Sequence, residues 1–189
     1  APAFHGAMKH AIGPRKSLGI RTVFNLLGPL TNPADADRQL LGVFSSKWVR
    51  PVAEALQQLG IERALVVHGE IGMDEISLKG QTRYAEVNDA EITEGRFRPS
   101  DFGLKPINLE EIAGGDIETN RKIAEELFDA QAPEAIESII SVNAGAVIYL
   151  GGEADSIRNG IERARQSIQS GKARHCLHRL VEFTQSATG

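Results

Sequence analysis

A strand, a helix and a second strand follow one another within residues 39–68, and this order limits the possible folds more than any other feature. The apolar run QLLGVF at 39–44 is bounded by turn residues, as expected of a buried strand. Residues 47–59 repeat apolar side chains at helical spacing, and RALVVH at 63–68 is a second buried run. Parallel strands need a crossover connection, usually a helix, and this crossover is right-handed in nearly all known cases. The sequence therefore predicts a parallel crossover unit.

The remaining elements extend the sheet and cover it. Three shorter, more polar stretches predict an antiparallel extension: 75–78, 82–87 and 95–99. From about Asp116, which we expect to cap a helix, the spacing stays helical. The candidate helices are 117–128, 135–150, 154–170 and 173–185. We therefore expect one α/β domain over residues 1–189, with a central, mostly parallel sheet, an antiparallel extension and flanking helices.

Charge and cysteine content argue against several classes of function. A formal net charge of −4 is a poor match for nucleic acid or an anionic membrane surface as the main partner. The single cysteine, Cys176, excludes an internal disulfide. No run of about 18 apolar residues is present. We therefore expect a cytoplasmic protein that binds neither nucleic acid nor a membrane.

Two neighbouring acids, Asp74 and Glu75, follow the second predicted strand in the segment VVHGEIGMDEIS at 66–77. In open α/β sheets, ligands favour the crevice outside the carboxyl ends of the parallel strands. One or two carboxylates, with a substrate phosphate completing the shell, are the usual way in which Mg²⁺ is held. A solvated turn that carries two acids by chance is the alternative, and spacing alone does not decide between them.

Basic and histidine side chains give less specific signals. Arg15, Lys16 and Arg21 form a basic group. A guanidinium can bind a carboxylate or phosphate through two parallel hydrogen bonds, but a solvated helix face has the same composition. His175 and His178 lie one helical turn apart and could belong to a metal site, although no complementary ligand cluster is evident. The sequence contains no Walker loop, serine nucleophile elbow or dinucleotide fingerprint.

Several segments together resemble the anthranilate phosphoribosyltransferase family. They are FHGAMKHAIGPRKSLGIRTVFNLLGPLTNP, QLLGVFS, VVHGEIGMDEIS and GGDIETN. They occur in the family's order, and the resemblance as a whole covers essentially all 189 residues. This family of glycosyltransferases joins anthranilate to the ribose of phosphoribosyl pyrophosphate in tryptophan biosynthesis, and releases pyrophosphate. The resemblance implies the carboxy-terminal α/β domain shared by nucleoside phosphorylases and phosphoribosyltransferases.

The resemblance implies a metal role for the acidic pair. In the family, two acids after a GxxG segment hold Mg²⁺ against the pyrophosphate of the sugar donor, and here they correspond to Asp74 and Glu75. Magnesium would stabilise the charge that develops on the leaving pyrophosphate. No catalytic general base is evident, and an aromatic amine that attacks an activated sugar needs little such help.

The resemblance also implies an anthranilate site. The family's anthranilate-binding arginine, ten residues after the histidine of the FH pair, corresponds to Arg15. That histidine, His5, lines the anthranilate channel in the family, and Gly28 and Pro29 lie along its wall. One departure is Gly6, where the family usually has proline; this change removes no functional group.

The resemblance covers only part of the family's sequence. A glycine-rich pyrophosphate-binding loop, a KHGN-like segment and a helical domain that makes the dimer contact all lie upstream in the family, and they do not occur in these 189 residues. We therefore expect a carboxy-terminal portion that does not catalyse the transfer alone. The parent enzyme is expected to be a homodimer through the helical domain.

Two other classes of function remain open. Pyrimidine nucleoside phosphorylases have the same architecture and carry similar segments, although the acidic pair fits the transferase better. A non-enzymatic relative that binds nucleic acid is the other alternative. The net charge of −4 and the intact acidic pair argue against it.

Overall fold

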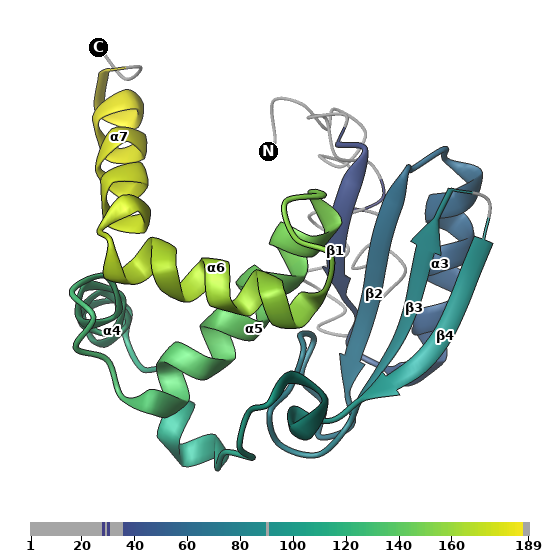
Figure 1. Ribbon diagram of the computed structural model, residues 1–189, viewed down its shortest axis with the longest axis horizontal. Coiled ribbons are helices and arrows are strands. Elements are labelled where there is room, and N and C mark those ends of the chain that lie inside the picture. The colour runs from purple at the N-terminus through teal and green to yellow at the C-terminus, as the bar shows by residue number, and fades with distance from the viewer. Residues whose placement is uncertain (1–27, 29, 31–35, 90, 187–189) are drawn as a thin grey trace, which may run out of the picture.

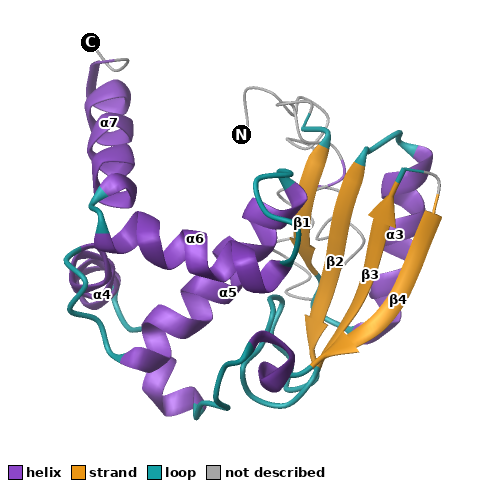
Figure 2. Cartoon of the chain, in the orientation of Figure 1, coloured by secondary structure: helices purple, strands orange, loops and turns teal. Residues whose placement is uncertain are grey.

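One mixed sheet forms the centre of the molecule (Figures 1 and 2). The computed structural model describes residues 28, 30, 36–89 and 91–186. Within them, the strands are β1 (Arg38–Gly42), β2 (Arg63–Gly69), β3 (Thr82–Asn88) and β4 (Glu91–Phe97), in that order across the sheet. β1 and β2 pair in parallel, whereas β2–β3 and β3–β4 are antiparallel. The predicted α/β fold with an antiparallel extension is confirmed.

The predicted crossover unit is also confirmed. Helix α3 (Val49–Gln58), preceded by the 3-10 helix η2 (Ser46–Trp48), connects the parallel strands β1 and β2. The buried residues of α3 are Val49, Val52, Ala53 and Leu56. Their spacing places them on one helical face, which packs in a core cluster against buried residues of the sheet. In Figure 1, α3 lies behind the sheet.

The continuous apolar run of β2 reflects burial on both faces of the sheet. Ala64 and Val66 belong to the core cluster beneath α3. The intervening Leu65 and Val67 belong to a second cluster, which contains apolar residues of helices α5 and α6. All four side chains are fully buried. Because side chains alternate along a strand, a strand between two helical layers must be apolar at every position.

Four helices follow the sheet and agree with the predicted ones to within a few residues at each end. They are α4 (Ile117–Phe128), α5 (Glu134–Leu150), α6 (Ile157–Gln169) and α7 (Lys172–Ser186). α7 has no buried residue and extends away from the sheet (Figure 1). In the described part of the chain, no helix has the length and apolar character that a membrane span requires.

Helices α5 and α6 cross at a point where their backbones touch. A Cβ atom built on Gly160 would lie 2.2 Å from the carbonyl oxygen of Gly145. One built on Gly145 would lie 2.6 Å from the backbone nitrogen of Ile161. Any side chain at either glycine would force the helices apart, so this crossing depends on both of them.

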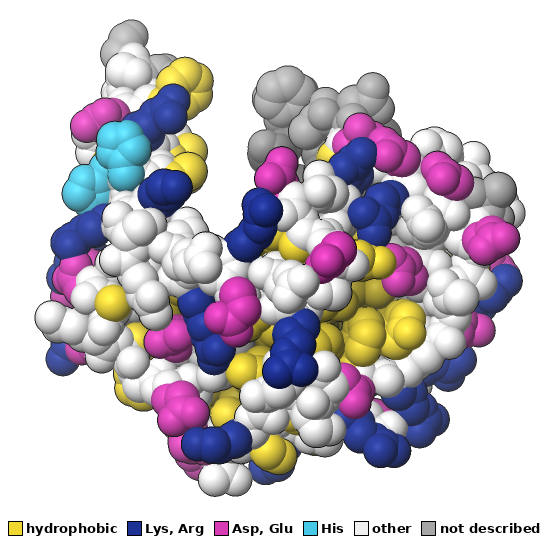
Figure 3. Space-filling model, viewed as in Figure 1, with side chains coloured by type: hydrophobic (Ala, Val, Ile, Leu, Met, Phe, Trp, Pro, Cys, Tyr) yellow, Lys and Arg dark blue, Asp and Glu magenta, His cyan; other side chains and the backbone are white. Residues whose placement is uncertain are grey.

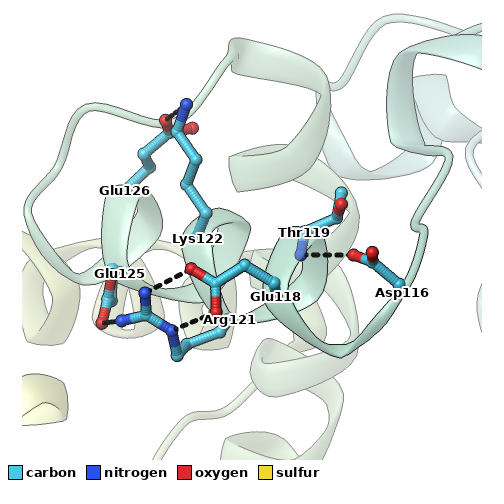
Figure 4. A network of polar contacts seen from close by, with 7 residues as sticks. All are labelled: Asp116, Glu118, Thr119, Arg121, Lys122, Glu125 and Glu126. Atoms are coloured by element: carbon cyan, nitrogen blue, oxygen red, sulfur yellow. Dashed lines mark hydrogen bonds and ion pairs between the residues drawn. The ribbon is translucent and has the colours of Figure 1, made fainter.

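The predicted cap of α4 is confirmed (Figure 4). The Asp116 carboxylate accepts a hydrogen bond of 2.9 Å from the backbone N–H of Thr119, which lowers the pKa of Asp116. Along the exposed face of the helix, Arg121 pairs with both Glu118 and Glu125. These pairs are three and four residues apart, the spacing that brings side chains together on a helix.

Two expectations about the sheet are wrong for the described residues. The sheet there is mixed rather than mostly parallel, because only β1 and β2 run in parallel. Residues 75–78 form a loop and not a strand. The backbone N–H of Ile76 donates to a side chain of α5, and that of Ser77 donates to the hydroxyl of Thr82. These hydrogen bonds replace the strand pairing that the alternating pattern suggests.

Candidate functional site

The acidic pair lies in a loop that turns back sharply at the end of β2. The N–H of Gly69, the last residue of β2, donates to the carbonyl of Met73 at 2.8 Å. The N–H of Gly72 donates to the carbonyl of Gly69, also at 2.8 Å. These two hydrogen bonds close a tight turn, so that Asp74 and Glu75 lie directly beyond the end of the strand.

The same loop crosses the end of the neighbouring strand, β1. Gly42 is the last residue of β1, and a Cβ atom built there would lie 1.5 Å from the carbonyl oxygen of Asp74. Because β1 and β2 are parallel, their carboxyl ends meet at one edge of the sheet. The acidic pair therefore lies at the carboxyl ends of the parallel strands, where open α/β sheets favour ligands.

The two acids have different environments. Asp74 is exposed, whereas Glu75 is half-buried. Burial raises the pKa of the Glu75 carboxyl, and the nearby charge of Asp74 raises it further. Both effects penalise the doubly ionised pair. A dication bound to the pair would relieve the repulsion and restore the solvation that burial removes.

Asn143, in the middle of α5, holds the loop from the helical side. Its Oδ1 accepts a hydrogen bond of 2.9 Å from the N–H of Ile76, and its Nδ2 donates to the carbonyl of Ile76 at 3.0 Å. The sequence reasoning missed Asn143. A single amide within a long apolar helix was the available signal, since such residues are poor helix formers unless they have a specific partner.

Further hydrogen bonds fix both sides of the loop. The ring Nδ1 of the buried His68 lies 2.7 Å from the carbonyl oxygen of Val43, which ties the end of β2 to the residue after β1. The hydroxyl of Ser77 donates to the carbonyl of Lys79 at 2.9 Å, and accepts from the N–H of Lys79 at 3.0 Å. The backbone around the acids is therefore anchored at both ends.

Of the four residues predicted to form the anthranilate site, the structure describes only Gly28. His5, Arg15 and Pro29 lie outside the described residues. Gly28 is helical and half-buried. The assignment of these four residues to anthranilate stays a prediction.

The donor set at the acidic pair suits magnesium. Within residues 36–89 and 91–186, no group of three or more His, Cys, Asp and Glu side chains could hold a metal ion. The histidines of α7, His175 and His178, are exposed on the surface (Figure 3). Two carboxylates alone make an incomplete shell for zinc. They match magnesium, which completes its shell with water and substrate phosphate.

Comparison with known families agrees with this fold. Residues 1–174 match the family model described as glycosyl transferase family, a/b domain. The chain belongs to this family.

Several proteins similar to the chain are named anthranilate phosphoribosyltransferase. The protein of that name from Halorhodospira halophila is 50% identical over 185 residues, which are 98% of this chain and 54% of the relative. The crystal structure of the Thermus thermophilus enzyme is 43% identical with a TM-score of 0.88, over 96% of this chain and 53% of that one. The Saccharomyces cerevisiae enzyme in complex with PRPP and Mg is 32% identical with a TM-score of 0.85, over 98% and 54% of the two chains. The chain thus spans about half the length of the curated relatives it matches.

Proposed function

We propose that the chain is the α/β portion of an anthranilate phosphoribosyltransferase, which moves the phosphoribosyl group from phosphoribosyl pyrophosphate to the amine of anthranilate with Mg²⁺. The observation that carries the proposal is the acidic pair, Asp74 and Glu75, fixed at the carboxyl ends of β1 and β2. The 50% identity to a relative of that name over 98% of the chain supports the same activity.

Different residues of the chain would bind the two substrates. In the reaction, the amine nitrogen of anthranilate forms a bond to C1 of the ribose, the bond from C1 to the pyrophosphate oxygen breaks, and the amine loses a proton. When bound, magnesium supplies positive charge against the pyrophosphate oxygens. Asp74 and Glu75 would hold it on the donor side. Arg15 would hold the anthranilate carboxylate through two hydrogen bonds, in a channel formed by His5, Gly28 and Pro29.

The proposal applies to the protein at the full length of its relatives. We propose that residues 1–189 form a single α/β domain. The glycine-rich pyrophosphate loop and the helical domain would come from the other half, through which the parent would form a homodimer in the cytoplasm. The α/β portion alone should bind the substrates too incompletely to catalyse transfer.

The assay of a full-length protein tests this proposal. Incubated with anthranilate, phosphoribosyl pyrophosphate and Mg²⁺, it should form phosphoribosyl anthranilate, measured by chromatography with mass detection. Omission of Mg²⁺ should remove the product, and residues 1–189 alone should form none. Phosphorolysis of thymidine by the full-length protein, without transfer to anthranilate, would instead identify a pyrimidine nucleoside phosphorylase.

Substitution of Arg15 tests the acceptor site. Arg15→Ala in the full-length protein should raise the KM for anthranilate about 10-fold to 100-fold, because it removes charged hydrogen bonds worth about 1.5–3 kcal/mol. The KM for phosphoribosyl pyrophosphate should change much less. Steady-state kinetics with each substrate varied in turn measures both values. A larger effect on the donor than on anthranilate would move Arg15 out of the acceptor site.

A further inference from the structure

We infer that Asn143 of α5 is a positioning residue for the acidic pair. It holds the backbone of Ile76, the residue after Glu75, and orients the carboxylate of Glu75 for a bound cation. This inference rests on the proposed function, because it concerns the same metal site. Asn143 lies 67 residues from Ile76 in the chain, so the contact joins the helical layer to the loop.

The first step is the grip of Asn143 on the loop backbone. The Ile76 side chain is fully buried, and buried backbone polar groups need hydrogen-bond partners. Asn143 supplies both, since its Oδ1 accepts from the Ile76 N–H at 2.9 Å and its Nδ2 donates to the Ile76 carbonyl at 3.0 Å. The side-chain amide thus supplies the two hydrogen bonds that a neighbouring strand would otherwise make to Ile76. It fixes the residue that directly follows Glu75.

The second step is the contact with the carboxylate itself. The same Nδ2 lies 3.4 Å from Oε2 of Glu75, a long hydrogen bond, and also donates to the carbonyl of Ile139 at 3.0 Å. A neutral amide donor orients a carboxylate without neutralising it. The charge of Glu75 therefore stays available for a cation, whereas a lysine or arginine at this position would compete with the cation.

The third step is the rigidity of the support. Asn143 is followed two residues later by Gly145, where α5 touches α6 backbone to backbone. The neighbouring Val142 and Ala146 are fully buried in the core. The amide therefore projects from a fixed part of α5, as a residue that orients metal ligands must.

Asn143→Asp is the sharpest test, because aspartate keeps the shape and the Oδ1 acceptor. It replaces the N–H donor with a charged oxygen facing the Ile76 carbonyl and Glu75. The measurement is calorimetric binding of phosphoribosyl pyrophosphate to the full-length protein, with and without saturating Mg²⁺. We expect the enhancement of affinity by Mg²⁺ to fall about tenfold, within the range for residues that orient metal ligands. The affinity without Mg²⁺ and the KM for anthranilate should stay near those of the unmodified protein.

Asn120→Asp is the matched control. Asn120 of α4 grips the backbone of Gly115 in the same way, since its Oδ1 accepts from the N–H and its Nδ2 donates to the carbonyl, each at 3.0 Å. It is exposed and has no contact with the acidic pair among its hydrogen bonds. This variant should keep the full enhancement by Mg²⁺. If Asn143→Asp does not fold, Asn143→Ala carries the test, with a smaller expected loss in the enhancement by Mg²⁺ because no repulsive charge is added.

The outcomes separate the inference from the proposed function. An enhancement by Mg²⁺ that is unchanged in the Asn143 variants, or equal losses of donor affinity with and without Mg²⁺, would overturn the positioning role. Retention of the enhancement by the double variant Asp74→Asn and Glu75→Gln would instead overturn the metal site, and the inference with it. A selective loss in the Asn143 variants, together with complete loss in the double variant, supports both.

Discussion

Replacement of both acids, Asp74→Asn with Glu75→Gln, should lower kcat/KM of the full-length protein at least a thousandfold, or about 4 kcal/mol of transition-state stabilisation. Neutral amide oxygens are weak ligands for Mg²⁺, and charge on the departing pyrophosphate would then develop without the several kcal/mol that a metal ion supplies. Initial rates measured across a magnesium titration test this. The residual rate of the variant should no longer depend on Mg²⁺. Unchanged turnover would remove the metal assignment.

The stability of this double variant without metal is an informative control. Burial and the charge of Asp74 raise the pKa of Glu75 in the folded state, so the folded protein holds the proton more tightly than the unfolded chain. The stability associated with the protonated form is present below the ordinary glutamate pKa and is lost as pH rises through the raised value. At neutral pH the unmodified protein carries this penalty and the variant does not. In the absence of Mg²⁺, the variant should therefore unfold at the same or a higher temperature.

A second pair of adjacent acids controls for charge alone. Glu125 and Glu126 lie on α4, where they pair with Arg121 and Lys122 on the surface. Glu125→Gln with Glu126→Gln removes the same formal charge as the double variant at the strand ends. Its turnover and its dependence on Mg²⁺ should equal those of the unmodified protein. A comparable loss in this control would indicate a general electrostatic effect instead of a bound cation.

The regular elements could be predicted because their physical cause is local in the sequence. The apolar positions of α3 repeat at helical spacing, and β2 is apolar throughout because helices cover both of its faces. The strand predicted at 75–78 is instead a loop, and the cause of its conformation is not local in the sequence. Its alternation resembles that of a strand, but the groups that satisfy its backbone are side chains, one of them 67 residues away. A local pattern contains no information about such partners.

The candidate site shows the same division. The position of Asp74 and Glu75 after a parallel strand could be predicted, because the order of elements determines which end of the sheet a loop occupies. The contact between Gly42 and Asp74, and the grip of Asn143, depend on how three separate segments pack together. These contacts form only in the folded chain, and they fix the position of the loop that carries the two acids.

Gly42→Ala should therefore damage the site although neither acidic residue is substituted. The new methyl group would lie 1.5 Å from the Asp74 carbonyl oxygen, and that oxygen belongs to the backbone. The loop must shift, and a displacement of about 1 Å can reduce a rate about a hundredfold. We expect that loss in kcat/KM, with a loss of about 1–3 kcal/mol in the free energy of unfolding from overpacking. Kinetics and denaturant unfolding of the full-length protein measure the two effects.

Gly151→Ala is the matched control for this substitution. It makes the same change at a glycine where a methyl group fits without a clash. Gly151 follows α5 with a φ of −66°, and a Cβ atom there would be 3.4 Å from the Val147 carbonyl oxygen, an ordinary contact. This variant should keep its turnover and its stability. If Gly42→Ala also kept both, the loop could hold its acids without contact with β1. The carboxyl end of β1 would then have no part in positioning the metal, and the burial and hydrogen bonds of residues 75–77 alone would account for the site.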